Sequence, residues 1–219
     1  AYGTYTYHSD GYYSYNEFHD CGRRGISVAE VRFDEFACKA ENIIIENNYF
    51  HDGWHTTGID LNTTGIEHEL KNVQIRNNFF EGNPKIKNSD RDYQNSNHVY
   101  ISNQCPRIGT TANVSNIWIY NNIFTYAQGS AIKIEKVDSV FIWNNTFYCF
   151  NPSLTNYQAF IYISENDLGI PKDIEVKNNI FYNNVPCKTN SDLHAIKADA
   201  DWYKSVLTVD YNLYYLKDP

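Results

Sequence analysis

The stretch KNVQIRNNFF, residues 71–80, is one of five closely similar ten-residue segments in the chain. The other four are ENIIIENNYF (41–50), SNIWIYNNIF (115–124), DSVFIWNNTF (138–147) and KDIEVKNNIF (172–181). Weaker copies lie towards the two ends of the sequence, GYYSYNEF (11–18) and LTVDYNLY (207–214). Seven copies of one segment identify a repeat protein, in which neighbouring copies bury their apolar faces against one another.

Each segment has the pattern of a short strand followed by a bend. Apolar residues such as Val73 and Ile75 alternate with variable ones, which is typical of a strand with one buried face. Asparagine follows, and it tolerates left-handed backbone and bonds backbone groups with its side chain. We expect one asparagine of each copy to stack in a column that satisfies buried backbone groups. The column asparagines are Asn16, Asn48, Asn78, Asn122, Asn145, Asn179 and Asn212.

A second strand follows each segment after a loop. These strands are GISV (25–28), GIDL (58–61), HVYI (98–101), AIKI (131–134), FIYI (160–163) and AIKA (195–198). Successive column asparagines lie between 23 and 44 residues apart, with no amphipathic helical pattern between them. The sequence therefore predicts an all-β fold, a right-handed parallel β-helix (solenoid) of about seven coils with loop insertions. At ~4.8 Å per coil, the stack would be about 34 Å long.

Length and composition predict one domain and exclude several partners. With 219 residues, 42% of them hydrophobic, the chain suffices for one core, so residues 1–219 are expected to form a single β-helix domain. A net charge of -8 disfavours nucleic acid and anionic lipid as partners. No apolar run is long enough for a membrane span. Because the chain has no methionine, not even an initiator, we expect it to be a mature form or a part cut from a longer protein.

The I-x-I-x-N-N-x-F segment followed by G-I-x-I resembles the carbohydrate-active right-handed β-helix proteins, the pectate-lyase-like superfamily. Within that group it is most similar to the disaggregatase-related surface proteins of methanogenic archaea, which degrade or associate with a chondroitin-like envelope polysaccharide. The resemblance covers residues 11–214 and implies a polysaccharide partner and an extracellular or cell-surface location. The segment is scaffold and carries no catalytic group. The aspartate clusters of pectate lyases and polygalacturonases are not recognisable in this sequence.

Candidate site residues lie in columns, because equivalent positions of successive coils align and alternate residues of a strand face outward. The second strands give a central outward column of Ser27, Asp60, Tyr100, Lys133, Tyr162 and Lys197. The column two residues further on holds Ala29, Asn62, Ser102, Glu135, Ser164 and Asp199. The column two residues earlier holds Gly25, Gly58, His98, Ala131, Phe160 and Ala195. We expect all three to face outward, with the small residues of the last leaving a groove.

These columns carry the side-chain types that bind and cleave an acidic sugar chain. We predict a glycoside hydrolase for a uronate-containing glycan, with Asp60 and Glu135 as acid and base, because convergent side chains can approach the roughly 6.5–9.5 Å spacing of an inverting enzyme. Lys133 would neutralise the substrate, and His55, on the loop before Asp60, would carry protons. Expected substrate-binding residues are Tyr100, Tyr162, Lys197, His98 and Trp54.

Two other functions stay open. In a polysaccharide lyase, Lys133 or Tyr100 would remove the proton beside a uronate carboxylate, and a cation such as Ca²⁺ would hold that carboxylate. The hydrolase needs no cofactor, and no metal site is assigned, because the five cysteines form no CxxC pair and no carboxylate spacing demands calcium. The third function is a non-catalytic glycan-binding or cell-surface module, in which the column is only a solvated face.

A group of large aromatic residues lies at outward positions of the repeated segment. Trp118, Tyr120, Phe141 and Trp143 belong to adjacent coils. Such a cluster marks an interface or a covered surface. We expect it to dock another domain or subunit or to lie under the insertion 81–97, in preference to stacking on sugar.

Overall fold

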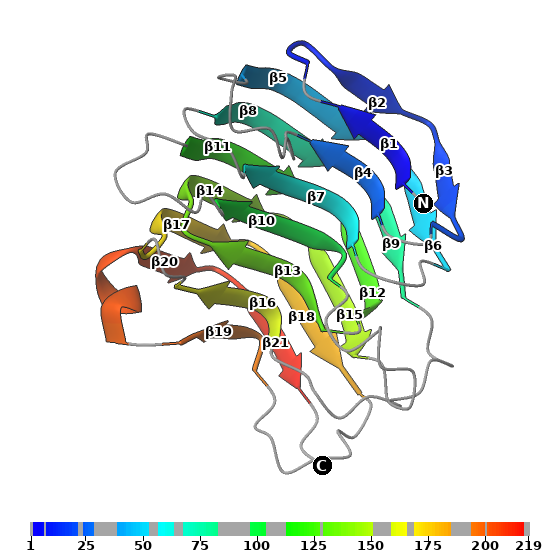
Figure 1. The fold of residues 1–219 in the computed structure, drawn as a ribbon. Coiled ribbons are helices and arrows are strands. Elements are labelled where there is room, and N and C mark those ends of the chain that lie inside the picture. Colours follow the sequence, from blue (N-terminus) through cyan, green and yellow to red (C-terminus); the bar gives the residue numbers. More distant parts are fainter. Residues whose placement is uncertain are drawn as a thin grey trace.

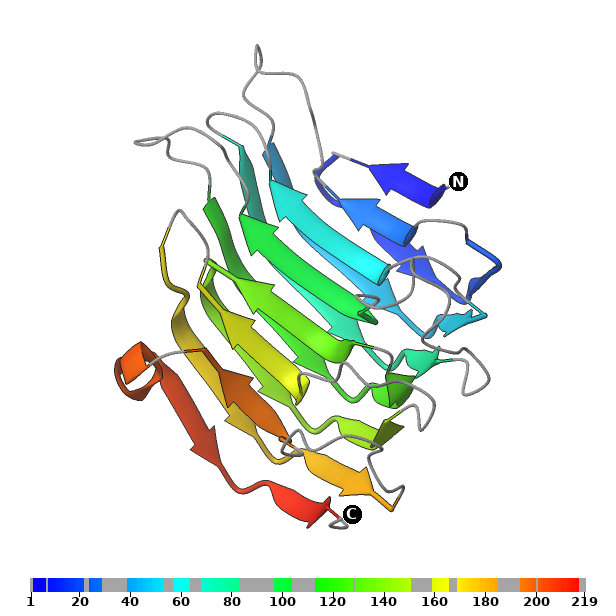
Figure 2. The same cartoon turned by 60° about the horizontal axis from the view of Figure 1, so that its bottom comes forward.

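The computed structural model describes residues 2–6, 8–21, 24–28, 39–52, 57–63, 68–82, 97–103, 113–127, 129–150, 159–165, 169–184, 194–199 and 201–216. The chain forms a right-handed parallel β-helix (Figures 1 and 2). Each of seven coils contributes one strand to each of three seven-stranded sheets. The predicted fold class is therefore confirmed.

The sheets are named A, B and C. Sheet A contains β1 (Tyr2–Thr6), β4 (Arg24–Val28), β7 (Thr57–Thr63), β10 (Val99–Asn103), β13 (Ser130–Glu135), β16 (Ala159–Ser164) and β19 (Ile196–Ala198). Sheet B contains β2 (Tyr12–Ser14), β5 (Lys39–Glu46), β8 (Glu69–Arg76), β11 (Asn113–Tyr120), β14 (Asp138–Trp143), β17 (Lys172–Lys177) and β20 (Leu207–Asp210). Sheet C contains β3 (Glu17–His19), β6 (Tyr49–His51), β9 (Phe79–Glu81), β12 (Ile123–Ala127), β15 (Thr146–Phe150), β18 (Ile180–Asn183) and β21 (Leu213–Leu216). The short 3-10 helix η2 (Asp201–Ser205) lies between β19 and β20.

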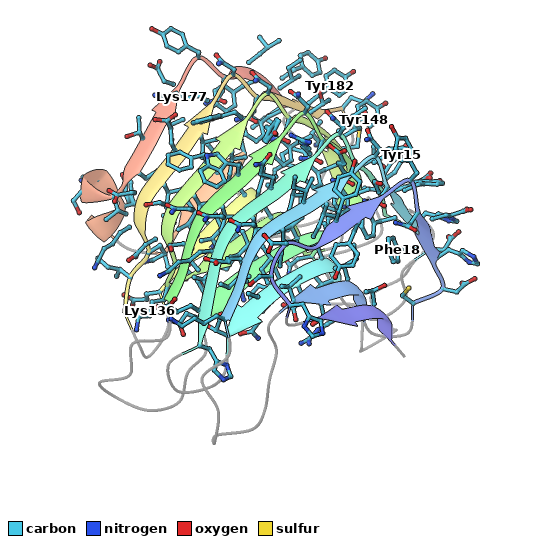
Figure 3. All side chains as sticks on the ribbon, turned by 90° about the horizontal axis from the view of Figure 1, so that it is seen from above. Tyr15, Phe18, Lys136, Tyr148, Lys177 and Tyr182 are labelled. Carbon is cyan, nitrogen blue, oxygen red and sulfur yellow. The ribbon has the colours of Figure 1, made fainter. Side chains whose placement is uncertain are left out.

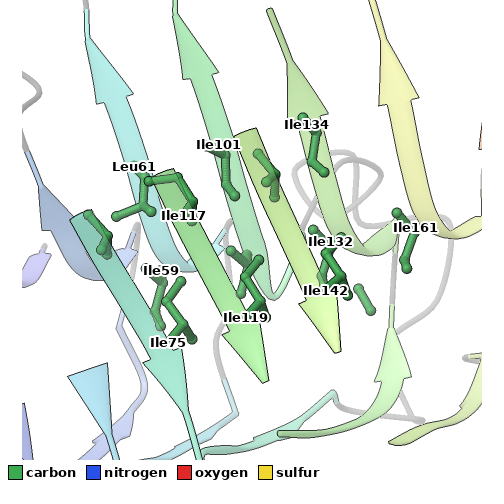
Figure 4. Packing of buried hydrophobic residues seen from close by; sticks show 14 of the residues in the cluster. Ile59, Leu61, Ile75, Ile101, Ile117, Ile119, Ile132, Ile134, Ile142 and Ile161 are labelled. Carbon is green, nitrogen blue, oxygen red and sulfur yellow. The ribbon is translucent and has the colours of Figure 1, made fainter. Parts of the chain in front are cut away.

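The interior is filled by aliphatic side chains and a stack of phenylalanines. Isoleucines of sheet B, such as Ile75, Ile119 and Ile142, lie among Ile59, Ile101 and other residues of sheet A (Figure 4). The inward aromatic residues of sheet C stack from coil to coil, with Phe80 and Phe124 ring centroids 4.8 Å apart. This burial is the main stabilising term of the coil stack.

The predicted asparagine column is present inside the bend between sheets B and C. The backbone N–H of Asn78 donates to Oδ1 of Asn122 at 2.9 Å, and its Nδ2 donates to the Ile45 carbonyl of the preceding coil at 2.9 Å. The left-handed backbone belongs to the preceding residue, Asn77, with φ of 55°. The two asparagines of each pair therefore have different tasks: one makes the bend and the other joins coils.

A second asparagine ladder, not foreseen from the sequence, runs along sheet B. Asn42, Asn72 and Asn116 have positive φ, and Nδ2 of Asn72 donates to Oδ1 of Asn42 at 3.1 Å. Nδ2 of Asn116 donates to Oδ1 of Asn72 at 3.3 Å. Viewed from above the stack in Figure 3, Lys177 of sheet B and Tyr148 and Tyr182 of sheet C lie on the outside.

Candidate functional site

The central column predicted on the second strands is one row across sheet A. Strand pairing aligns Asp60 with Tyr100, Tyr100 with Lys133, Lys133 with Tyr162, and Tyr162 with Lys197. The next column is aligned in the same way, as Asn62, Ser102, Glu135 and Ser164. Residues up to 137 positions apart in the sequence therefore become neighbours on one face, as the repeat predicted.

Lysines and tyrosines alternate along this row. Nζ of Lys133 lies 5.5 Å from the ring centroid of Tyr100 and 5.8 Å from that of Tyr162. Nζ of Lys197 lies 5.5 Å from the Tyr162 centroid. These distances are within the range of cation–π attraction. The ammonium groups thus cover faces of the tyrosine rings, so a sugar would meet ring edges and lysines instead of open aromatic faces.

Glu135 is the best-connected carboxylate on this face. It accepts hydrogen bonds from the Tyr100 hydroxyl at 2.5 Å and the Ser102 hydroxyl at 3.2 Å, and it pairs with Nζ of Lys133 at 2.7 Å. Burial alone would raise the pKa of Glu135, but the bonds from Lys133 and Tyr100 outweigh it and lower the pKa below its ordinary value. Glu135 is therefore ionised at neutral pH, which suits a base and not an acid.

Asp199, the residue after β19, lies in the same column as Glu135. The Tyr162 hydroxyl donates to Oδ2 of Asp199 at 2.5 Å. Burial and this bond to Asp199 raise the pKa of Tyr162 well above its ordinary value, so the hydroxyl stays protonated. The sequence placed Asp199 in this column without giving it a role. Two strand spacings, about 9.6 Å, separate its backbone from that of Glu135, and convergent side chains would bring the carboxyl groups into the roughly 6.5–9.5 Å range of an inverting pair.

Asp60 lies in the outward row but its side chain is buried, which corrects its predicted role as an accessible acid. Its side chain is 0% exposed and forms an ion pair with Nε of Arg24 on the neighbouring strand at 2.8 Å. A buried ion pair of this kind fixes β4 against β7 and gives a substrate no access to the carboxylate. Asp60 therefore does not fit the acid and base pair with Glu135.

The predictions that His98 faces outward to bind substrate and that a groove lies beside it are also wrong. Its ring packs against Phe80 and Phe124 with centroids 5.7 Å and 6.0 Å apart, and its Nε2 donates to the Thr125 carbonyl at 3.0 Å. Burial lowers the pKa of His98 to about 4, so the ring is neutral. Phe160, at the equivalent position, packs in the same way on the phenylalanine stack. This column faces the interior because the chain turns into sheet A at these residues.

The remaining predicted residues divide into two groups. Trp54 and His55 lie outside the described residues. The aromatic group lies on sheet B, as predicted, with Trp118 stacked on Phe141 at 5.9 Å and with Trp143 tilted against Phe141 at 5.2 Å. All four of its side chains, Trp118, Tyr120, Phe141 and Trp143, are half-buried.

Comparison with protein-family models, curated proteins and solved structures found no match to this chain. Within the described part of the chain, no group of three or more His, Cys, Asp or Glu side chains is arranged to hold a metal ion. In the same residues, no helix combines the length and apolar character needed to cross a membrane.

Proposed function

We propose that the outer face of sheet A binds an acidic, uronate-containing polysaccharide of the cell envelope or extracellular space and hydrolyses it. The observation that carries this proposal is the setting of Glu135, an ionised carboxylate held by Lys133 and Tyr100 within a row of alternating lysines and tyrosines. The row supplies cations for the uronates, and Glu135 supplies a base for water.

Asp199 is the proposed acid, and in this role it must carry a proton although the bond from the Tyr162 hydroxyl favours its charged form. It lies in the column of Glu135 at a backbone separation of about 9.6 Å, so the two side chains must converge to reach the roughly 6.5–9.5 Å of an inverting pair. Lys133 and Lys197 flank Tyr162 and would neutralise acid groups on the sugar. Hydrolysis then proceeds by attack of water, deprotonated by Glu135, while Asp199 protonates the leaving oxygen.

The lyase reaction has less support from these side chains. β-Elimination requires a base that is unprotonated when it removes the proton beside the uronate carboxylate. Of the two candidate bases, Lys133 is held in an ion pair with Glu135 at 2.7 Å, and the Tyr100 hydroxyl donates its proton to Glu135 at 2.5 Å. A lyase would also leave an unsaturated sugar that absorbs in the near ultraviolet, whereas a hydrolase leaves only new reducing ends.

A non-catalytic glycan-binding or cell-surface module is the second candidate, and one observation favours it. The hydroxyls of Tyr100 and Tyr162 and the charges of Lys133 and Glu135 all have partners within the protein. A face whose polar groups are already satisfied is stable without a substrate. Such a module would bind the glycan and show no turnover.

The test is depolymerisation of uronate-containing polysaccharides, followed by reducing ends and by ultraviolet absorbance. We expect reducing ends without absorbance, and a loss of about 10²–10⁴-fold in rate for Glu135→Gln. Glu46→Gln is the matched control, because Glu46 also accepts a tyrosine hydroxyl and pairs with a cation, Arg76, on sheet B. No turnover by the unchanged chain, with binding retained, would identify the binding module instead. An equal loss of rate in Glu135→Gln and Glu46→Gln would contradict the placement of the active site on sheet A.

A further inference from the structure

Two adjacent coils repeat a histidine and aspartate pair at the end of their strands in sheet C. His19 is the last residue of β3 and is followed by Asp20, and His51 is the last residue of β6 and is followed by Asp52. Strand pairing aligns His19 with His51, and their rings stack with centroids 5.5 Å apart. Figure 1 shows β3 and β6 side by side. The proposed site on sheet A uses none of these residues.

The bond within each pair is the same in both coils. Nδ1 of His19 lies 3.0 Å from Oδ2 of Asp20, and Nδ1 of His51 lies 2.9 Å from Oδ2 of Asp52. Both aspartates have left-handed backbone, with φ of 49° and 47°. A carboxylate oxygen only accepts hydrogen bonds, so each Nδ1 carries a proton and donates it. This bond joins consecutive residues and needs no other coil.

Among the described residues, His51 differs from His19 in a second bond, which joins the two coils. Nε2 of His51 lies 2.8 Å from Oε1 of Glu17 on β3. The Glu17 carboxylate is again an acceptor only, and a ring that donates from both nitrogens is a charged imidazolium. The His51 ring also stacks on Tyr49 with centroids 4.3 Å apart, and the face of a tyrosine ring attracts a cation.

The surroundings of His51 stabilise this charge. Burial lowers the pKa of His51, but the bonds and charges of Asp52 and Glu17 outweigh it, so the pKa lies above the ordinary value of 6.5. The His51 side chain is 17% exposed, whereas that of His19 is 54% exposed. The other titratable groups on the neighbouring strands are His19 on β3, Tyr49 on β6 and Glu81 on β9, which accepts the Tyr49 hydroxyl.

We propose that His51 is a proton-dependent link between the first and second coils. A neutral imidazole has one donor nitrogen, so loss of the proton leaves the other nitrogen with a lone pair facing a carboxylate. The bond to Glu17 is the one that breaks, because the bond to Asp52 is local and its counterpart in His19 forms without a second acid. Docking of the first coil therefore depends on pH.

The raised pKa of His51 defines the pH range of the link. Stabilisation of the first coil by His51 is complete below the ordinary value of 6.5 and is lost as the pH rises through the raised value. The Glu17 side chain is 61% exposed, so solvent screens the pair and the effect is modest. At high pH the first coil should open locally more often while the later coils stay folded.

Hydrogen exchange of the 219-residue chain tests the link at the backbone N–H of Asn16, which donates to Oδ1 of Asn48 in the second coil at 3.0 Å. From about pH 6.5 to 8.5, we expect the protection factor of this N–H to fall about two- to fivefold. The backbone N–H of Asn122, which donates to Oδ1 of Asn145 in the same way, should keep its protection because it lies far from His51. No fall at Asn16 would overturn the proposal.

Two variants separate His51 from other titratable groups. His51→Tyr, which copies Tyr148 at the equivalent position of a later coil, does not lose a proton in this range and should remove the fall at Asn16. His19→Tyr is the matched control and should keep the fall, because the hydrogen bond of His19 is the local one to Asp20. The same fall in His51→Tyr as in the unchanged chain would contradict the link.

A direct titration by NMR decides the point on the unchanged chain. The imidazole shifts of His51 should have a midpoint above 6.5, and Glu17→Gln should lower that midpoint because the charge of Glu17 favours the imidazolium. A midpoint at or below 6.5, or a midpoint that Glu17→Gln does not move, would overturn the proposal, whether or not His51→Tyr folds.

Discussion

Glu135 on sheet A and Glu46 on sheet B have nearly the same immediate surroundings. Each accepts a tyrosine hydroxyl, from Tyr100 and Tyr12 respectively, and each forms an ion pair with a cation, at 2.7 Å and 2.5 Å. The pKa of each carboxyl lies below its ordinary value. For Glu46, the bonds from Tyr12 and Arg76 stabilise the charged form. For Glu135, burial favours the neutral form, but the bonds from Lys133 and Tyr100 outweigh it. A single carboxylate with these partners therefore does not distinguish a catalytic face from a structural one.

The bond between tyrosine and acid is a repeated way of joining coils. In every case the acid lies one coil ahead and two residues beyond the register partner of the tyrosine. The pairs are Tyr12 with Glu46, Tyr49 with Glu81, Tyr100 with Glu135 and Tyr162 with Asp199. What differs is the register partner itself, which is Ile44 on sheet B, Phe79 on sheet C, and Lys133 or Lys197 on sheet A. Sheet A differs from the other sheets because its register partners are lysines and because two of the tyrosine and acid pairs lie in one row.

The strongest test of this difference is a substitution of Asp199, the acid of the second pair on sheet A. If Asp199 is the acid, Asp199→Asn should lower the rate on polysaccharide by about 10²-fold or more, because the leaving oxygen is no longer protonated. An aryl glycoside with an acidic leaving group needs no such proton and should be cleaved at nearly the original rate. Parallel assays on the two substrates decide the point. Equal losses on both would assign Asp199 to coil joining, like Glu46.

A large pH dependence of stability is expected from His98, which directly precedes β10 and faces the interior. Its folded pKa of about 4 lies below the ordinary 6.5, so the unfolded chain binds more protons between these values. Stability from this residue is complete above pH 6.5 and is lost as the pH falls towards 4. His98→Phe, which copies Phe160 at the equivalent position, should flatten denaturation midpoints across this range. An unchanged pH dependence would place His98 in solvent.

Removal of single tyrosine hydroxyls should lower stability on both faces and activity on only one. Tyr100→Phe deletes a bond to a carboxylate and should cost about 1.5–3 kcal/mol at most. Tyr12→Phe should cost less, because Tyr12 is 58% exposed and water replaces its hydroxyl. Only Tyr100→Phe should change turnover, because only Glu135 is proposed to touch substrate. Urea denaturation and reducing-end assays measure the two effects. Loss of activity in Tyr12→Phe at matched stability would contradict the distinction between the faces.

The fold could be predicted because each coil repeats the same information. Alternating apolar residues such as Val73 and Ile75 set the strand, and of the two asparagines that follow, the first makes the bend and the second joins the neighbouring coils. The same pattern occurs in every repeat, so a weak pattern in one copy does not change the fold that the other copies predict. The short outer ladder from Asn42 to Asn116 escaped notice because its residues also read as ordinary outward positions of a strand.

The site was harder to predict because alternation does not say where a strand begins to turn. His98 has the parity of Tyr100, yet it directly precedes β10, where the chain enters sheet A, and its ring packs against Phe80 and Phe124. Asp60 has the correct face, but it is buried and paired with Arg24 of the preceding coil, and no local pattern connects these two residues. The tyrosine and acid pairs were detectable, since aligning the repeats places an acid two residues beyond each partner of Tyr100 and Tyr162.

The smallest expected effect is also the most direct test of why sheet A differs from sheet B. Lys197 lies over the Tyr162 ring, whereas Lys177 on sheet B pairs with Glu175 at 2.8 Å. If the row binds uronates, Lys197→Ala should weaken binding of an acidic oligosaccharide about fivefold, or about 1 kcal/mol, and should make binding less sensitive to salt. Lys177→Ala should do neither. Calorimetric titrations at two salt concentrations measure both quantities, and equal effects of the two variants would mean that net charge alone, and not the row on sheet A, attracts the glycan.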